Sequence, residues 1–229
     1  MEADKTFGWH NTNIVDARSR LLRGETYKDL STIWITATRD HIPAKIVQCW
    51  MNVMSPMNQK FTRLFLENME VADAYNQGIE FILSNPELSK WRYILTVEED
   101  NMPPSDGLLK LYEDMGKFDA VSGLYWTKGE GGQPMIYGDP KVMPKNFMPQ
   151  VPIIDGVQEC NGLGMGFTLF KLSMFKKMQK PWFKTLQERG KVCTQDLWFF
   201  NNAATSGFRF ACDTRVKVGH YDANTKMVW

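Results

Sequence analysis

Three consecutive carboxylates follow an apolar segment of the chain. Residues 93–97 read YILTV and predict a buried strand, and Glu98, Glu99 and Asp100 come directly after it. Open α/β sheets bind ligands at the carboxyl ends of their parallel strands. Strand alternation would point Glu98 and Asp100 to one side and Glu99 to the other, so Glu98 and Asp100 could hold a hard cation. The alternative is a solvated acidic turn before a helix.

His220 is one of only three histidines in the chain, and it follows a strand-like segment, 216–218, through Gly219. Carboxylate oxygens and one imidazole suit a Mn²⁺ or Mg²⁺ site in which substrate phosphates complete the octahedron. His220 is therefore a candidate partner of Glu98 and Asp100. The alternative is a histidine that serves only packing or the surface.

Asp196 is a candidate for acid–base chemistry. Gln195 and Asp196 begin a predicted helix after Thr194, a residue type that often caps helices. Asp196 could act as a general base or hold an acceptor hydroxyl. Alternatively, it could only stabilise the N-terminus of the helix.

Three glycines, Gly162, Gly164 and Gly166, stand within five residues. They do not form a dinucleotide-binding G-x-G-x-x-G motif, because Phe167 and Leu169 occupy the positions where the third glycine would fall. We expect either a close approach of the backbone beside a pocket or tight packing.

Residues 171–191 are strongly basic. They contain Lys171, Lys176, Lys177, Lys180, Lys184, Arg189 and Lys191 against the single acid Glu188. Such a segment is either a solvated face or a docking surface for an anionic acceptor, nucleic acid included.

The elements that must position these residues alternate between strand and helix over the first 125 residues. We expect strands at 32–37, 59–65, 91–97 and 120–125 and helices at 42–54, 71–83 and 106–115. This order implies a mostly parallel central sheet flanked by helices, which is an α/β layer fold similar to nucleotide-binding folds.

The second half of the chain is less regular. We expect short strands at 135–137, 151–154, 166–170, 208–212 and 216–220 and helices at 172–178 and 194–206. We interpret residues 1–229 as one domain with a peripheral extension (1–30), a nucleotide-binding half (31–125) and a half that forms the acceptor pocket and completes the metal site (126–229).

Composition restricts the class of protein. Lys and Arg number 27 against 26 Asp and Glu, which leaves a net charge of +1, and 43% of the residues are hydrophobic. This excludes a disordered chain, a collagen and a protein that coats polyanions. Four widely spaced cysteines predict buried free thiols, and the N-terminus shows no secretory leader pattern. We therefore expect a cytoplasmic protein without a membrane span.

In their order along the chain, these segments resemble the nucleotide-sugar glycosyltransferases of the GT-A fold. The resemblance covers roughly residues 31–222 and rests on 35–39, 74–76, 93–101, 162–170, 194–196 and 218–220. In that family a D-x-D-type motif holds a divalent cation on the sugar-nucleotide diphosphate, and a late histidine often completes the metal site.

The resemblance implies a role for each matching residue. Asp100 would be the principal metal ligand, His220 the late ligand and Glu98 a contact to the ribose or to a metal-bound water, while Asp196 would meet the acceptor hydroxyl. The nucleotide pocket would include Thr36, Thr38, Arg39, Asn76 and Glu99, and the pocket for donor sugar and acceptor would include Trp126, Gly162, Gly164 and Gly166. The chain departs from the family pattern at Glu98, where Asp is usual, and at Gln195, where Glu is usual.

The implied reaction transfers a sugar from a nucleoside-diphosphate sugar to an acceptor hydroxyl, with inversion or retention left open. The acceptor could be a saccharide, a protein, a small molecule or a hydroxylated DNA base. One alternative is a nucleotidyltransferase that makes a nucleotide sugar, although residues 36–40 lack the glycines of a phosphate loop. Another is a non-catalytic protein that docks a partner through residues 171–191.

Overall fold

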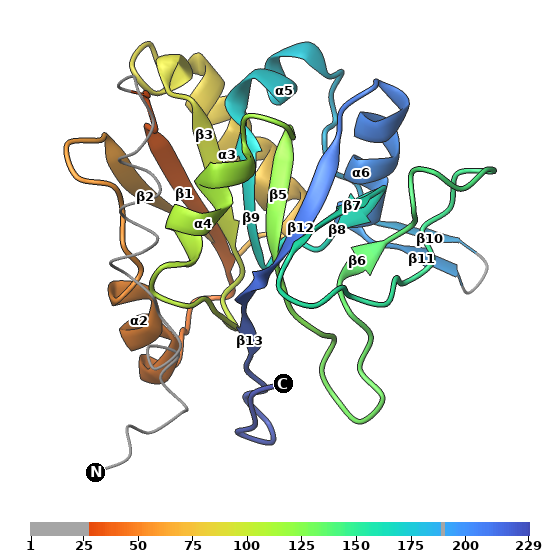
Figure 1. Cartoon of the computed structure of the whole chain (residues 1–229). Helices are drawn as coiled ribbons and strands as arrows, with labels where there is room; N and C mark the ends of the chain where they lie inside the picture. The colour runs from red at the N-terminus through yellow and green to blue at the C-terminus, as the bar shows by residue number, and fades with distance from the viewer. Residues whose placement is uncertain (1–27, 189–190) are drawn as a thin grey trace.

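The computed structural model describes residues 28–188 and 191–229, and its centre is a seven-stranded sheet (Figure 1). In spatial order the strands are β2 (Phe61–Glu67), β1 (Thr32–Thr38), β3 (Tyr93–Val97), β9 (Phe167–Lys171), β5 (Ala120–Leu124), β12 (Phe210–Lys217) and β7 (Val157–Cys160). The predicted α/β class, with helices flanking a central sheet, is therefore confirmed.

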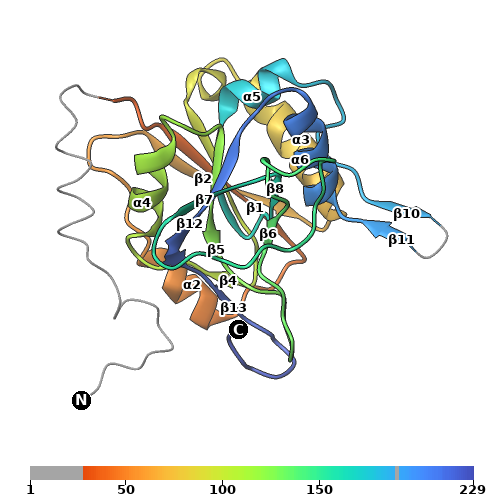
Figure 2. The ribbon, with the colours of Figure 1, turned by 45° about the vertical axis from the view of Figure 1, so that its right-hand side comes forward.

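The helices lie on both faces of this sheet. They are α2 (Ala44–Met51), α3 (Val71–Ser84), α4 (Gly107–Asp114), α5 (Leu172–Lys177) and α6 (Gln195–Thr205), with a 3₁₀ turn η2 (Leu88–Lys90) before β3. In Figure 2, α4 lies on one side of the sheet and α3 and α6 lie on the other. None of the helices in the described ranges is long and apolar enough to cross a membrane.

Three small two-stranded sheets complete the described structure. They are β4 (Asn101–Met102) with β13 (Gly219–His220), β6 (Ile136–Tyr137) with β8 (Gly162–Leu163), and β10 (Leu186–Glu188) with β11 (Lys191–Cys193). All three pairings are antiparallel. The pairing of β4 with β13 joins the segment after β3 to the segment that contains His220.

The central sheet is mixed rather than mostly parallel. β1 pairs in parallel with β2 and β3, and β5 pairs in parallel with β12. However, β9 lies antiparallel between β3 and β5, and β7 lies antiparallel on β12. A strand buried on both faces has the same apolar pattern in either direction, so the sequence did not reveal that β9 runs the other way.

Alternate residues of the strands face two separate layers of core. Ile33 and Ile35 of β1 face the layer under α3, α5 and α6, whereas Trp34 faces the layer under α2 and α4. All three side chains have no exposed surface. Helices therefore cover both faces of β1, as expected for a parallel strand in an α/β sheet.

An aromatic cluster fills the layer under α3, α5 and α6. The ring of Phe199 in α6 stacks on Phe183 with 4.8 Å between centroids and lies within 5.5 Å of Phe170 and Phe175. Phe199 is fully buried. This cluster anchors α6 to β9 and α5, and the first turn of α6 carries Asp196.

Two predicted features of the second half are wrong. Residues 151–154 form no strand, and Val151 and Ile154 are 88% and 91% exposed. Pro152 has no amide hydrogen to donate to a sheet, and the strand of this region begins later, at Val157. The two strands expected at 208–212 and 216–220 are mainly one strand, β12, whose polar centre contains an ion pair between Arg215 and Asp213 at 2.7 Å.

The four cysteines are free thiols, as the sequence predicted. Cys49, Cys160 and Cys212 are buried, as predicted, whereas the prediction of burial is wrong for Cys193, which is partly exposed. Burial raises the pKa of the Cys49 thiol to about 12, which disfavours its reactive thiolate. The buried cysteines therefore behave as small core residues.

We expect Phe199→Ala to lower the free energy of unfolding by about 3–5 kcal/mol, because it leaves a cavity in the aromatic cluster. The matched control is Phe81→Ala in α3, where the side chain is 52% exposed and the loss should stay within about 0.5 kcal/mol. Urea denaturation of both variants measures the difference. Equal losses at the two positions would show that the cluster does not hold α6 in place.

Candidate functional site

The carboxylates after β3 and the late histidine are brought together by a two-residue ladder. Gly219 pairs with Met102 and His220 with Asn101 in the antiparallel pairing of β13 and β4. The backbone N–H of Tyr221 donates to the carbonyl oxygen of Asp100 at 2.7 Å. The end of β3 and the end of the chain therefore form one edge, which lies at the bottom of the sheet in Figure 1.

Asp100 and His220 face each other across this ladder. The Nε2 atom of His220 lies 3.5 Å from Oδ2 of Asp100. The Nδ1 atom of His220 lies 2.7 Å from the carbonyl oxygen of Trp126, which makes Nδ1 the donor in the neutral ring. Nε2 is then the ring nitrogen that faces Asp100, and a metal ion bound there would replace a proton on Nε2 while Nδ1 keeps its hydrogen bond to Trp126.

Lys128 is a third member of this group, and no sequence pattern predicted it. Its Nζ atom lies 2.5 Å from Oδ2 of Asp100. Burial disfavours the charged form of Asp100, but hydrogen bonds to His220 and Lys128 outweigh this effect and lower the pKa of Asp100. Asp100 is therefore an ionised carboxylate with two partners on one oxygen.

Glu98 lies close to two other acids. Burial, together with the nearby carboxylates of Asp100 and Asp196, raises the pKa of Glu98 to about 8. The backbone N–H of Glu98 donates to the carbonyl oxygen of Gly166 at 3.2 Å. The charges of Asp100 and Asp196 thus both act on Glu98, although Asp196 comes from a distant segment.

Asp196 occupies the first turn of α6 and is 6% exposed. Its Oδ1 atom accepts hydrogen bonds from the backbone N–H of Leu197, at 2.8 Å, and from the hydroxyl of Thr194. Burial raises the pKa of Asp196 in spite of these hydrogen bonds. Thr194 makes no side-chain cap on the helix, since its hydroxyl binds Asp196.

Gly162, Gly164 and Gly166, which were expected beside a pocket or in tight packing, lie against bulky side chains. A Cβ atom on Gly164 would stand 2.0 Å from the hydroxyl oxygen of Tyr125, and one on Gly166 would stand 2.6 Å from Oδ1 of Asn101. The N–H of Gly166 donates to the Tyr125 hydroxyl at 2.8 Å. At these positions the glycines serve tight packing, while their contact with donor or acceptor stays a prediction.

Two residues expected in the nucleotide pocket form hydrogen bonds within the protein. The Thr36 hydroxyl accepts from Nε1 of Trp34 at 2.8 Å, and Thr36 is fully buried. The Asn76 amide donates to the carbonyl oxygen of Phe183 at 2.8 Å and accepts from the backbone N–H groups of Trp182 and Phe183. Asn76 therefore ties α3 to the segment before β10.

Arg39 and Glu99 form a pair at the same edge of the sheet. Nε of Arg39 lies 2.7 Å from Glu99 Oε1, and the Arg39 backbone N–H donates to Oε2 at 2.8 Å. The Arg39 side chain is 86% exposed. Thr38 lies beside this pair and accepts from the backbone N–H of Asp40, so these three candidates lie together near the end of β1.

Two buried polar side chains near the site were also missed by the sequence analysis. Within the described ranges, the Tyr75 hydroxyl and both side-chain amide atoms of Asn101 are buried and have no hydrogen-bond partner. Burial raises the pKa of Tyr75, and the charges of Glu98 and Asp100 add to the effect. Tyr75 lies in the apolar stripe of α3 and Asn101 follows the acidic run, so neither carried a separate signal.

Three lysines of the basic segment have partners within the protein. Lys171 pairs with Asp119 at 3.1 Å, Lys180 pairs with Glu80 at 2.5 Å, and the Lys184 ammonium lies over the Trp198 ring. Arg189 lies outside the described residues, as do residues 1–27, which include most of the expected N-terminal extension. The docking surface across 171–191 stays a prediction.

We expect Gly164→Ala to lower the free energy of unfolding by at least about 1–3 kcal/mol, because the added methyl group overlaps the Tyr125 hydroxyl. The control is Gly116→Ala, where no atom lies within 4 Å of the added Cβ, and its effect should stay within about 0.5 kcal/mol. Urea denaturation compares the two. A Gly164→Ala variant as stable as Gly116→Ala would mean that this close approach does not constrain the site.

No family model and no curated protein sequence matches the chain. Among solved structures, A197 from STIV aligns with a TM-score of 0.63 and 17% identity over 86% of this chain and 92% of that chain. GalNAc-T7, in a crystal structure with UDP, GalNAc and Mn²⁺, aligns with a TM-score of 0.59 and 9% identity over 85% of this chain and 44% of that chain. At such identities the likeness concerns the fold, and the chain has a GT-A-like α/β fold.

Proposed function

We propose that the protein is a metal-dependent glycosyltransferase that uses a nucleoside-diphosphate sugar as donor. The observation that carries the proposal is the Asp100–His220 pair, whose Oδ2 and Nε2 atoms lie 3.5 Å apart at the carboxyl end of β3. This edge is where α/β sheets bind ligands. The similarity of the fold to GalNAc-T7, whose crystal structure contains UDP, GalNAc and Mn²⁺, supports the same assignment.

The donor set suits Mn²⁺ or Mg²⁺. Asp100 supplies an ionised carboxylate and His220 supplies a nitrogen lone pair, whereas no cluster of three or more His, Cys, Asp or Glu side chains in the described ranges could hold a metal alone. Mg²⁺ typically takes one or two protein carboxylates and completes its shell with water and substrate phosphates. The bound cation would neutralise the charge that develops on the leaving diphosphate.

Asp196 is the proposed residue for the acceptor. It is buried near Glu98, and its Oδ1 atom is held by Leu197 and Thr194. In an inverting reaction Asp196 would remove the proton of the acceptor hydroxyl, and in a retaining reaction it would orient that hydroxyl. Its raised pKa makes it a stronger base than an exposed aspartate.

The remaining residues of the edge would bind the nucleotide. Arg39 is exposed and carries a positive charge beside Glu99, so it could contact a phosphate or a ribose without large rearrangement. The ammonium group of Lys128 forms an ion pair with Asp100, so a metal cation that binds Asp100 would compete with Lys128. Saccharides, proteins, small molecules and hydroxylated DNA bases remain the proposed acceptor classes.

We expect Asp100→Ala and His220→Ala to abolish Mn²⁺-dependent binding of nucleoside diphosphates, since each removes a proposed ligand. Isothermal titration with a panel of nucleoside diphosphates, with Mn²⁺ and then with chelator, measures this. Asp73→Ala, which removes an exposed carboxylate of α3, is the control and should bind like the wild type.

Lys128→Gln tests the same site by a change that should maintain or increase its affinity for Mn²⁺. It frees Asp100 from a competing positive charge, so Mn²⁺ alone should bind this variant at least as tightly as the wild type. Undiminished nucleotide binding in both Asp100→Ala and His220→Ala would overturn the metal assignment.

We expect Asp196→Asn to slow hydrolysis of the bound donor by about 10²–10⁴-fold, because the amide cannot accept the proton of the attacking water. The amide oxygen of the variant still accepts the hydrogen bonds from Leu197 and Thr194 that Asp196 accepts. The substitution also removes a buried carboxylate whose charged form is disfavoured. The melting temperature should therefore not fall. The measurements are donor turnover and thermal unfolding, with Asp73→Asn as the control, and unchanged turnover would exclude Asp196 from catalysis.

A further inference from the structure

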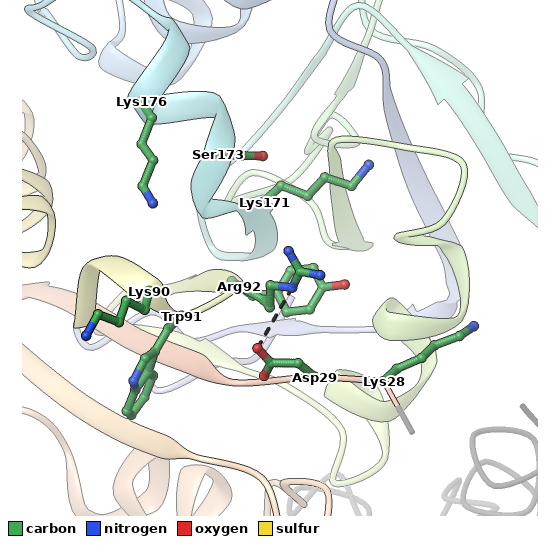
Figure 3. A pocket seen from close by; sticks show the side chains of 9 residues that line it. Lys28, Asp29, Lys90, Trp91, Arg92, Lys171, Ser173 and Lys176 are labelled. Carbon is green, nitrogen blue, oxygen red and sulfur yellow. Dashed lines mark ion pairs between the residues drawn. The ribbon is translucent and has the colours of Figure 1, made fainter. Parts of the chain in front are cut away.

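A polar pocket lies at the opposite end of β3 from the candidate site. Its volume is about 480 Å³, which falls within the usual range for small-molecule pockets. Five basic residues and one acid line it, together with uncharged side chains (Figure 3). The charged residues are Lys28, Asp29, Lys90, Arg92, Lys171 and Lys176.

The pocket is separate from the proposed transfer site. Tyr93 at the start of β3 lines the pocket, whereas Glu98 follows the other end of the same strand. Five residues of extended strand span about 16 Å. Lys171 pairs with Tyr93 across the sheet, while Phe167 pairs with Val97 at the far end, so β9 gives the same separation.

The backbone under these cations is held in place by hydrogen bonds between distant segments. The N–H of Arg92 donates to the carbonyl oxygen of Ser31 at 3.2 Å, and the N–H of Leu172 donates to the carbonyl oxygen of Arg92 at 2.8 Å. The N–H of Lys171 donates to the carbonyl oxygen of Asp119 at 2.9 Å. The segments that carry the cations are therefore fixed relative to one another before any ligand binds.

Within the described residues, most of the positive charge in this pocket is not neutralised. Arg92 has a long ion pair with Asp29, at 3.8 Å, and Lys171 pairs with Asp119 at 3.1 Å. Among the described residues, neither Lys28 nor Lys90 has an ion pair. Lys176 donates to a carbonyl oxygen, that of Ser89, at 2.6 Å, and this contact leaves its charge uncompensated.

The arrangement of the side chains fits a ligand with several negative charges. In Figure 3 Lys176 extends from α5 above the pocket, Lys90 and Arg92 lie opposite it, and Lys28 lies at the far side. A single carboxylate would contact one or two of these groups. Linked phosphates present acceptor oxygens in several directions, and lysine engages phosphate as a point charge.

We propose that this pocket binds a small ligand that carries two or more linked phosphate groups, at a site independent of the transfer site. The excess of positive charge over several chain segments, the fixed backbone and the pocket volume all support this chemistry. The proposal goes beyond glycosyl transfer, because the pocket contains none of the residues proposed to bind the donor, the metal or the acceptor hydroxyl. Lys171 and Lys176 belong to the basic segment 171–191.

The test is calorimetric titration of the full chain with tripolyphosphate in the presence of EDTA, which removes metal-dependent binding. We expect one site per chain and weaker binding at higher salt, because exposed charges are screened. Lys90→Gln/Lys176→Gln should weaken binding by about tenfold or more, since it removes two charge-assisted contacts from exposed positions. Circular dichroism verifies that this variant is folded.

Two controls distinguish this pocket from the remaining charged surface and from the candidate transfer site. Lys141→Gln/Lys217→Gln removes the same charge from exposed positions outside the pocket and should bind tripolyphosphate like the wild type. Asp100→Ala should also bind it normally, whatever the outcome of the donor experiments. Equal binding by both lysine double variants, loss of binding in Asp100→Ala, or binding of single-stranded DNA without binding of tripolyphosphate would overturn the proposal.

Discussion

The ladder between β4 and β13 is the contact on which the candidate site depends. It joins Asn101 to His220 and thereby sets the Asp100 carboxylate beside the imidazole, although the two segments are far apart in the chain. The ladder has only two residue pairs, but it is supported on its outer side. His220 and Trp229 exchange two backbone hydrogen bonds of 3.0 Å each, so His220 is held between two strands of backbone. Its Nδ1 contact to Trp126 then fixes the ring.

The candidate site contains acidic side chains whose burial is unfavourable for folding. Glu98 and Asp100 follow β3 while Asp196 begins α6, and burial and mutual repulsion raise the pKa of Glu98 to about 8. Lys128 and His220 form their hydrogen bonds with Asp100. Clusters of buried acids with shifted pKa values are typical of functional sites, because such a cluster is costly for folding. A divalent cation at Asp100 would relieve this repulsion.

The two ends of the central strands have opposite electrostatic character. Acids gather after the end of β3, and cations gather around its start. The net charge of +1 conceals this separation, because it sums the 27 basic and 26 acidic residues of the whole chain regardless of their position. The net charge therefore excludes a protein that coats polyanions with its whole surface, but it does not exclude a single pocket that binds an anion. A donor held at one end and a phosphate ligand at the other would contact the same strands, β3 and β9, from opposite ends.

The sequence by itself determined the local features: the alternation of strands and helices up to residue 125 and the acids directly after β3. These follow from apolar periodicity and short-range order. Only the tertiary structure decided the direction of β9, the ion pair of Lys128 with Asp100 and the use of Asn76 inside the protein. The basic pocket belongs to this second group as well. Each of these features depends on which distant segments of the chain come together. The local sequence pattern of a segment does not specify its partner or the direction in which it pairs.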